Sequence, residues 1–417
     1  MPVDDTIETV FRISSPRVVA AAARIVRDVG LAEEIAQDAL VSALEQWPVT
    51  GIPDNPDAWL ITIARRRAVD VVRREQNYQR KLAEVGHGLD DVAPPTPDPD
   101  DIDDDLLRLI FVACHPVLST QARIALTLRL LGGLTTDEIA RAVLASQSTV
   151  AQRIVRAKKT LAAAQVPFEV PVGAARAARL ASVLEVVYLV FNEGYSATAG
   201  DDLLRPALCE DALRLARVLA ALMPDEPEVH GLLSLLSLQA SRMSTRTDPD
   251  GAAVLLADQD RSRWNRLLIR LGMESLDTAG GVGRRRGPGW AGPYCLQAAI
   301  AACHARATDY EDTDWSAIAA LYARLYVLTP SPVVALNRAV AVARSDGPEA
   351  ALVIVDALAD DPALRHYHLL PSVRGDLLVE LGRHDDARAE FTRAAELTQN
   401  ARERDLLLRR AAAANPS

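Results

Sequence analysis

The 417-residue sequence has few aromatic residues, few cysteines and no long apolar segment. Aromatic residues make up 4% of the chain, whereas hydrophobic residues make up 49% and charged residues 24%, which excludes a disordered protein. No apolar run approaches the ~18–20 residues of a membrane-spanning helix. The first residues lack the basic and apolar segments of a signal peptide. The sequence therefore predicts a cytoplasmic protein that does not enter a membrane.

The chain contains four cysteines, Cys114, Cys209, Cys295 and Cys303. They are too few and too widely spaced for a disulfide framework, and we expect small buried residues in a reducing compartment. His304 follows the last of them, but no fourth ligand for zinc is nearby. The Gly- and Arg-rich stretch 280–292 lacks the Gly-Lys-Ser/Thr of a phosphate-binding loop, and we expect a flexible loop there. The sequence thus predicts no metal and no other cofactor.

Charge is distributed unevenly along the chain, although the net charge is only −10. Residues 82–105 contain nine Asp or Glu residues and no Lys or Arg, whereas residues 106–165 contain eight basic residues against two acidic ones. Between Arg65 and Arg74 there are five arginines and one aspartate. Two basic segments thus flank an acidic one, and this local asymmetry indicates contact with nucleic acid.

Helical periodicity runs along the whole chain without strand-like alternation, so we predict an all-α fold. The first unit covers residues 6–80. Within it, Asn55-Pro56-Asp57 predicts a helix start, because Asn caps free N–H groups, Pro fits the first helical position and Asp meets the positive end of the dipole. The Pro-rich acidic segment 81–105 cannot bury enough apolar surface to fold alone and is predicted to be a linker.

Residues 106–165 form a second, basic unit with the pattern of a helix-turn-helix. The sequence predicts a helix over 136–143, a turn over 144–146 and a second helix over 147–161. An ordinary helical hairpin is the alternative for this motif taken alone. Candidate caps are Thr135 or Thr136 for the first helix and Ser146 or Ser148 for the second. Apolar side chains expected to seal the angle are Ile139, Ala140, Val143, Val150, Ile154 and Val155.

Residues 168–413 show an internal helical repeat. Ala317, Ala351 and Ala387 stand 34 and 36 residues apart, and an apolar residue follows each of them four positions later. The last copy, 374–397, has the offsets of a tetratricopeptide repeat. Because stacked helix pairs bury a continuous core, the sequence predicts a helical repeat domain.

The most distinctive segment of this third unit is FNEGY. An enzyme would use Glu193 as a general base, but no second carboxylate or histidine is nearby in the sequence. We therefore predict no catalysis. Instead, we expect Asn192 and Gly194 to end a buried helix and Phe191 and Tyr195 to pack the turn.

Segments 28–48 and 55–75 resemble the polymerase-binding helices and the −10 promoter segment of region 2 in bacterial extracytoplasmic-function (ECF) sigma factors. The helix-turn-helix unit resembles their region 4, which reads the −35 promoter element. The rest, with FNEGYSA (191–197) and GPYCLQAAIAACHA (292–305), resembles the subgroup with a large tetratricopeptide-like C-terminal extension. The resemblance implies a transcription factor that binds core RNA polymerase and promoter DNA and is not an enzyme.

Strand opening requires cationic side chains on phosphates and a pocket for an extruded base. In the −10 segment the candidate DNA-binding residues are Asn55, Arg65, Arg66, Arg67, Asp70, Arg73 and Arg74. In the second helix of the helix-turn-helix, Gln suits adenine and Arg suits guanine or phosphate. The candidates there are Ser148, Thr149, Gln152, Arg153, Arg156, Lys158 and Lys159. By resemblance, the polymerase-binding carboxylates are Asp28, Glu33, Glu34 and Asp38. A solvated face is the alternative for the arginines and carboxylates, and core packing is the expected role of Trp59.

The implied partners are the clamp helices and flap of core RNA polymerase, double-stranded promoter DNA and the melted −10 strand. The extension is expected to be regulatory, docking on regions 2 and 4 and leaving repeat surface for a protein partner. Two other functions remain open from the residues. One is a helix-turn-helix transcriptional regulator with a partner- or ligand-sensing repeat domain, and the other is an enzyme with helical domains.

Overall fold

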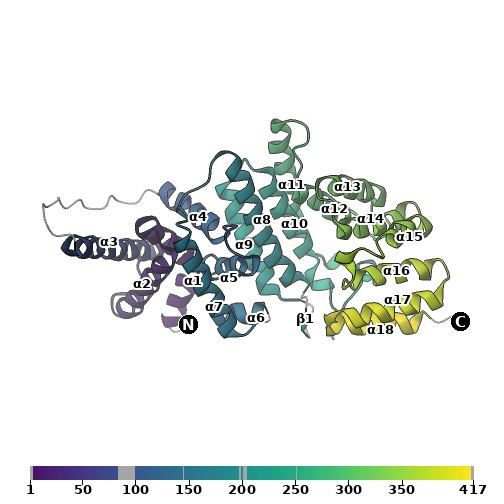
Figure 1. Ribbon diagram of the computed structural model, residues 1–417, viewed down its shortest axis with the longest axis horizontal. Coiled ribbons are helices and arrows are strands. Elements are labelled where there is room, and N and C mark those ends of the chain that lie inside the picture. The colour runs from purple at the N-terminus through teal and green to yellow at the C-terminus, as the bar shows by residue number, and fades with distance from the viewer. Residues whose placement is uncertain are drawn as a thin grey trace. The chain divides into compact units, whose positions relative to one another are not determined.

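The computed structural model describes residues 3–82, 99–143, 145–196, 199–200, 204–249 and 251–414. These residues form eighteen α-helices, four short 3-10 helices and two strands of two residues each. Figure 1 shows that helices make up nearly all of the ribbon. The predicted all-α fold is confirmed. The chain divides into two compact units, Met1–Leu189 and Val190–Ser417, and the boundary falls inside one helix.

Unit 1 begins with a three-helix group that continues into the helix-turn-helix. Its helices are α1 (Val3–Val26), α2 (Val29–Thr50), α3 (Pro56–Leu82), α4 (Pro99–Ala113), α5 (Thr120–Leu130), α6 (Thr136–Ala142), α7 (Gln147–Ala163) and the first part of α8 (Gly173–Tyr195). Helices α1, α2 and α3 pack against one another, and α4 packs on α1. Four consecutive alanines of α1, Ala20 to Ala23, are fully buried, because small side chains allow helix axes to approach closely.

The start of α3 follows the predicted pattern. The Asn55 side chain accepts a hydrogen bond from the Ala58 backbone N–H at 3.0 Å, and Pro56 is the first helical residue. Trp59, on the first turn, lies edge-on to the buried Trp47 of α2 at a centroid distance of 5.2 Å. This contact is the core packing expected of Trp59.

The acidic segment predicted as a linker is partly helical. Its residues 83–98 lie outside the described residues, and α4 begins at Pro99. The acidic residues at its end therefore form the first turns of a helix, whose C-terminal half is apolar and buried. Sequence composition alone did not reveal this, because the acidic run and the apolar run belong to the same helix.

The helix-turn-helix consists of α6 and α7. The Thr135 hydroxyl accepts from the Glu138 N–H at 3.2 Å, and the Glu138 carboxylate accepts from the Thr135 N–H at 2.7 Å, a reciprocal capping box. Ser146 caps α7 through the Thr149 N–H. Four of the predicted seal residues are buried: Ile139, Ala140, Val150 and Ile154.

Two details of that prediction differ in the structure. Val155 is 50% exposed and does not seal the angle, because it follows Ile154 directly and lies on the opposite side of α7 from the buried stripe. Val143 is only half-buried. Leu144, in the predicted turn, lies outside the described residues.

Unit 2 contains the remainder of the chain. After the end of α8 come β1 (Ala199–Gly200), α9 (Pro206–Leu222), α10 (Pro227–Ser241), η1 (Met243–Thr245), η2 (Leu256–Asp258), η3 (Arg261–Arg263), α11 (Arg266–Arg286), α12 (Pro293–Arg306), α13 (Trp315–Leu328), α14 (Pro332–Ser345), α15 (Pro348–Ala357), η4 (Pro362–Leu364), α16 (Leu369–Glu380), α17 (His384–Leu397), β2 (Gln399–Asn400) and α18 (Ala401–Ala413). Successive helices pack on their neighbours. Strands β1 and β2 pair in parallel, with Ala199 opposite Gln399 and Gly200 opposite Asn400.

Helices α16 and α17 form the last predicted repeat and pack closely. Ala387, Phe391 and Ala394 of α17 are buried. A Cβ atom on Gly375 of α16 would lie 2.7 Å from the Phe391 ring, so this position requires glycine. The small residues at repeat offsets therefore allow one helix to approach the next, as predicted.

The Gly- and Arg-rich stretch 280–292 is not a loop throughout, contrary to expectation. Helix α11 continues to Arg286, and its glycines at 280 and 283 are buried. A Cβ on Gly283 would collide with the Trp290 ring, which folds back on the helix. Close packing of Trp290 explains why the helix has a glycine at position 283.

Candidate promoter- and polymerase-binding surfaces

The predicted −10 arginines of α3 fall into two groups. Arg66, Arg73 and Arg74 are exposed. Arg67 instead donates to the Ser42 hydroxyl at 2.7 Å and pairs with Asp38 of α2 at 2.8 Å. The first group is accessible to a ligand, whereas Arg67 fixes α3 against α2.

The other predicted −10 residues lie on the same helix or at its start. Asp70 is exposed. Asn55 is exposed as well, although its side-chain oxygen is engaged as the cap of α3. Arg65 is half-buried and lies 4.0 Å from the carboxylate of Asp105 in α4. Arg65 thus links α3 to α4.

Asp105 is a fully buried carboxylate, which its place in an acidic run does not predict. Besides Arg65, its partners are Arg108 at 2.5 Å and Arg24 of α1 at 3.5 Å. Burial raises the pKa of Asp105, and the three arginines only partly offset this. The only signal in the sequence is that Asp105 directly precedes the apolar run of α4. This cluster joins α1, α3 and α4.

Helix α7 carries the predicted −35 residues, most of them exposed. The exposed residues are Ser148, Thr149, Gln152, Arg156 and Lys159, and Arg153 is half-buried. Thr149, Gln152 and Arg156 are spaced by three and four residues and therefore share one face of the helix. The Ser148 and Thr149 hydroxyls lie 3.0 and 2.7 Å from the Ser146 hydroxyl, which orders the first turn.

Lys158 is the exception among the α7 residues, because it pairs with a predicted polymerase contact. Its Nζ lies 2.5 Å from Oε2 of Glu33 in α2, and Glu33 is only 7% exposed. Oε1 of the same carboxylate accepts from Arg129 Nε of α5 at 2.6 Å. We call these three residues the Glu33 seam. It joins the first three-helix group to the helix-turn-helix.

The remaining predicted polymerase contacts are more accessible. Glu34 is exposed, and Asp38 has a 61% exposed side chain although it pairs with Arg67. Asp28 is half-buried and caps α2 through the Leu31 N–H at 2.8 Å. The four carboxylates therefore do not form one exposed surface in this arrangement.

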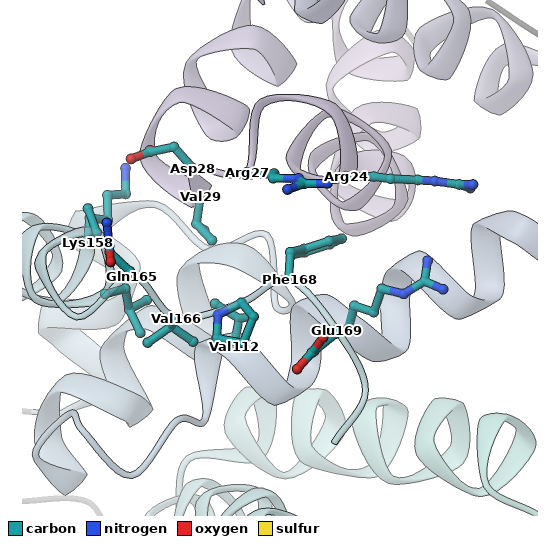
Figure 2. Close-up of a pocket in the computed structure, with 14 residues that line it drawn as sticks. Arg24, Arg27, Asp28, Val29, Val112, Lys158, Gln165, Val166, Phe168 and Glu169 are labelled. Carbon is teal, nitrogen blue, oxygen red and sulfur yellow. The ribbon is translucent and has the colours of Figure 1, made fainter. Parts of the chain in front are cut away.

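A cavity of about 830 Å³ lies beside the Glu33 seam, within unit 1 (Figure 2). Its wall comes from α1, α2, α4, α7 and the segment after α7. Figure 2 shows Asp28 and Lys158 directed towards each other on one side and Phe168 near the centre. Arg24 and Arg27 also line it, so the cavity is mainly cationic. The packing between the α1–α3 group and the helix-turn-helix therefore leaves a cavity beside the ion pairs of the Glu33 seam.

The first part of α8 packs on the helix-turn-helix domain through polar contacts. Arg123 of α5 donates to the Ser182 hydroxyl at 2.5 Å and to Glu185 at 2.9 Å. Arg179 donates to the Phe111 carbonyl of α4 at 2.8 Å. The beginning of the predicted extension is therefore part of the compact unit that holds the helix-turn-helix.

Membrane-spanning helices and metal-binding clusters are both absent from the part of the chain that the structure describes. No helix there is both long and apolar enough to cross a membrane. No group of three or more His, Cys, Asp or Glu side chains in the described ranges is arranged to hold a metal ion. Cys114, Cys209 and Cys295 are buried, and burial raises the pKa of Cys114 to about 11 and that of Cys209 to about 12.

Comparison with known families divides the chain in a similar way. Residues 10–78 match Sigma-70 region 2, and residues 108–161 match Sigma-70, region 4. Residues 179–280 match a family of unknown function, DUF6596. The region 2 match favours a sigma factor over a free-standing helix-turn-helix regulator, which has no use for such a domain.

Individual relatives agree with these matches. An uncharacterized protein of Rhizobium meliloti (strain 1021) is 47% identical over 393 residues, covering 93% of this chain and 91% of the relative. ECF RNA polymerase sigma factor SigK of Mycobacterium ulcerans (strain Agy99) is 34% identical over 142 residues, covering 33% of this chain and 74% of the relative. SigK of Mycobacterium tuberculosis (strain ATCC 25177 / H37Ra) is 34% identical over 154 residues, 35% of this chain and 78% of the relative. The chain therefore belongs to the ECF family of RNA polymerase sigma factors and carries, in addition, a large helical C-terminal extension.

Proposed function

We propose that this sigma factor works in the cytoplasm, reads the −35 element through α7 and opens the −10 element through α3, and catalyses no reaction itself. The observation that carries the proposal is the exposed face of α7. Thr149, Gln152 and Arg156 are exposed on one face of this helix, and the second helix of a helix-turn-helix is the one that enters the major groove. Gln152 suits adenine, and Arg156 suits guanine or a phosphate.

For the −10 element, the proposed contacts are the exposed α3 residues. Arg66 and Arg73 are seven residues apart and so lie on one side of the helix, where they can hold the phosphates of a separated strand. Arg74 and Asp70 lie beside them on the same helix. Arg65 and Arg67, which are engaged by Asp105 and Asp38, are proposed to position α3 instead.

For core polymerase, the proposed contacts are the carboxylates at the start of α2. Glu34 and Asp38 are accessible. Glu33 is buried against Arg129 and Lys158 and becomes available only when the seam separates. We therefore propose that the two groups of helices move apart when the sigma factor joins polymerase and promoter.

The extension is proposed to be a fused regulator needed for full activity. Its first helix, α8, packs on α4 and α5 through Arg123 and Arg179, so it is anchored to the −35-reading domain. Attachment along one chain gives an effective concentration of order millimolar, which keeps even a weak interface occupied. A variant cut before α8 would lose these buried contacts, so truncation tests should keep residues up to 189.

In vitro transcription with core polymerase tests the proposal. The template is the DNA upstream of the operon that encodes the protein, and the wild-type chain is expected to direct initiation there. Arg156→Ala is expected to reduce initiation, whereas Arg217→Ala, an exposed arginine of α9, serves as a control that leaves it unchanged. Initiation that does not depend on the added chain would contradict the proposal.

A further inference from the structure

Unit 2 contains a cavity of about 280 Å³ that the sigma factor function does not use. It is formed by the segment from the end of α10 to η2 together with α16 and α18. Its charged or titratable lining residues are Arg242, Arg246, His368, Glu403 and Arg410. Its aliphatic lining comprises Ala253, Val254, Leu255, Leu256, Leu369, Leu406 and Leu407. The cavity therefore combines a cationic part with an apolar wall.

Tyr195, the last residue of the FNEGY segment, accepts hydrogen bonds from two of these arginines. Arg242 Nε donates to the Tyr195 hydroxyl at 2.5 Å, and Arg246 donates to the Tyr195 backbone carbonyl. The Arg246 guanidinium also lies over the Tyr195 ring, 3.8 Å from its centroid. The ring in turn stacks on Phe191 at 5.5 Å. One tyrosine, fixed at the end of α8, thus places two guanidinium groups at the same cavity.

The charges around the cavity do not balance within the described residues. The hydrogen-bond partners of Arg242 are Tyr195 and Gln239, which are both uncharged. Burial, together with the charge of Arg242, lowers the pKa of Arg246, and the phenol and carboxyl groups nearby only partly offset this. Two like charges are therefore held close together in a partly desolvated site, which is unfavourable without an anion.

The single carboxylate that lines the cavity is already engaged. Glu403 Oε2 accepts from the Thr398 hydroxyl at 2.8 Å and lies 3.2 Å from Nε2 of His368. Burial alone would raise the pKa of Glu403, but these contacts and the charge of Arg246 lower it below the ordinary value. Arg410 pairs with Asp376 of α16. The Glu403 charge acts on Arg246, whereas the hydrogen-bond partners of Arg242 are uncharged. One further negative charge would therefore complete the site.

We propose that this cavity binds a small organic oxyanion, with a carboxylate or phosphate head at Arg242 and Arg246 and an aliphatic body along the leucines of η2, α16 and α18. Arginine suits such a head because its planar donors match two oxygens at once. The volume fits a short aliphatic chain rather than a dinucleotide. The extension is thereby a sensor of a small acidic metabolite, and FNEGY is its structural support.

Titration of the full-length protein with matched probes tests this. The probes are octanoate and octyl phosphate, which share an aliphatic body but differ in the head, with 1-octanol and inorganic phosphate as the body and head alone. Calorimetry is expected to give saturable 1:1 binding of octanoate, octyl phosphate or both, at least tenfold tighter than either control. A preference for one of them identifies a carboxylate or a phosphate ester as the head. Equal binding of 1-octanol, or no binding of either anion at millimolar concentration, would overturn the proposal.

Substitutions of Arg242 and Arg246 test whether these two side chains bind the anion. Arg246→Gln and Arg242→Lys are expected to weaken binding of the anions about tenfold or more, the second because lysine keeps the charge but loses the planar fork. Arg409→Gln, an exposed neighbour of Arg410 on α18, is the matched control with unchanged affinity. If Arg246→Gln fails to fold, the anion affinity of Arg242→Lys is the deciding measurement. Unchanged affinity in that variant would exclude the site.

Discussion

Lys158 of α7 and Glu33 of α2 form an ion pair, with 2.5 Å between Nζ and Oε2. The sequence predicts that the lysine binds promoter DNA and that the carboxylate binds polymerase. In the structure each of these two side chains pairs with the other. The Glu33 carboxylate is only 7% exposed and also contacts Arg129. In this arrangement it is therefore not accessible to polymerase or to DNA. In the function proposed above, recruitment to a promoter exchanges these intramolecular contacts for intermolecular ones.

We predict that Glu33 and Arg129 are energetically coupled. Replacing one partner of a mostly buried pair leaves the other charge uncompensated, whereas replacing both removes that penalty. A double-mutant cycle of Glu33→Gln and Arg129→Gln, read by denaturant unfolding, should show a coupling of about 1–3 kcal/mol. Glu34→Gln, at the exposed neighbouring position, should change stability by less than about 0.5 kcal/mol. Additive effects of the two substitutions would show that Glu33 and Arg129 are not coupled in folding.

For promoter opening, we predict that Arg66→Ala with Arg73→Ala impairs strand melting and leaves polymerase binding intact. Both side chains are exposed, so their loss should not disturb the helix packing. Permanganate footprinting of the −10 region measures the melting. Arg67→Ala is the contrasting variant, since it removes the bonds to Ser42 and Asp38 and should lower stability. An unchanged footprint in the double variant would mean that this face does not hold the open strand.

At the −35 element, Arg156→Ala should weaken promoter binding by about 1–3 kcal/mol if the side chain contacts a guanine through two hydrogen bonds. A phosphate contact would instead weaken binding to all sequences alike and reduce the salt slope by about one. Titrations of wild-type and altered −35 sequences at two salt concentrations separate the two roles. No change under any condition would remove Arg156 from the interface.

The sequence predicted the helices, their caps and the family well, because these depend on local pattern. Asn55, Thr135 and Ser146 each cap the helix expected from their position, and the repeat offsets around Phe391 hold. What the sequence could not show is which exposed-looking charges meet each other. Glu33 and Lys158 are 125 residues apart, and nothing in either segment indicates that α2 faces α7.

The predictions that differ from the structure also depend on three-dimensional contacts that a local pattern does not show. Val155 has the hydrophobicity of a seal residue, but helix geometry places it on the solvent side. The stretch 280–292 looks like a loop because it is rich in glycine, yet Trp290 packs on Gly283 and requires the absence of a side chain there. The acidic run that ends at Asp105 predicts a linker, whereas three arginines from separate elements enclose this residue.

The stability of unit 2 should depend on pH through His304. Burial, helped by the charges of Arg242 and Arg261, lowers the pKa of His304 to about 3. An unfolded chain would protonate this side chain near pH 6.5. Between these values the unfolded state binds the extra proton, so the free energy of unfolding falls as the pH drops from ~6.5 to ~3, by at most about 1.4 kcal/mol per pH unit.

Denaturant unfolding over this pH range measures the effect. His304→Phe keeps an aromatic ring against Trp315, whose ring centroid lies 5.2 Å away. This variant should lose the part of the pH dependence that comes from the histidine. The same slope in both proteins would show that another group is responsible.

Two glycines of unit 2 should respond oppositely to alanine. A Cβ on Gly231 of α10 would lie 2.7 Å from the backbone nitrogen of Cys295 in α12, so Gly231→Ala should destabilise by about 1–3 kcal/mol. Gly281, inside α11, has no atom within 4 Å of a Cβ, and Gly281→Ala should stabilise by about 0.5–1 kcal/mol. Thermal unfolding distinguishes them, and a shift of the same sign in both would contradict the close α10–α12 packing.

The parallel pairing of β1 with β2 joins positions 200 residues apart, since Gly200 lies opposite Asn400. During synthesis, at about 5–20 residues per second, the first strand leaves the ribosome some 10–40 s before the second. Unit 1 is complete at the start of that interval, while α18, which contributes to the anion-binding cavity proposed above, does not yet exist. Limited proteolysis of ribosome-stalled chains should therefore find unit 1 protected first. Each newly made molecule thus spends its first seconds with a promoter-reading half and an unfinished sensor.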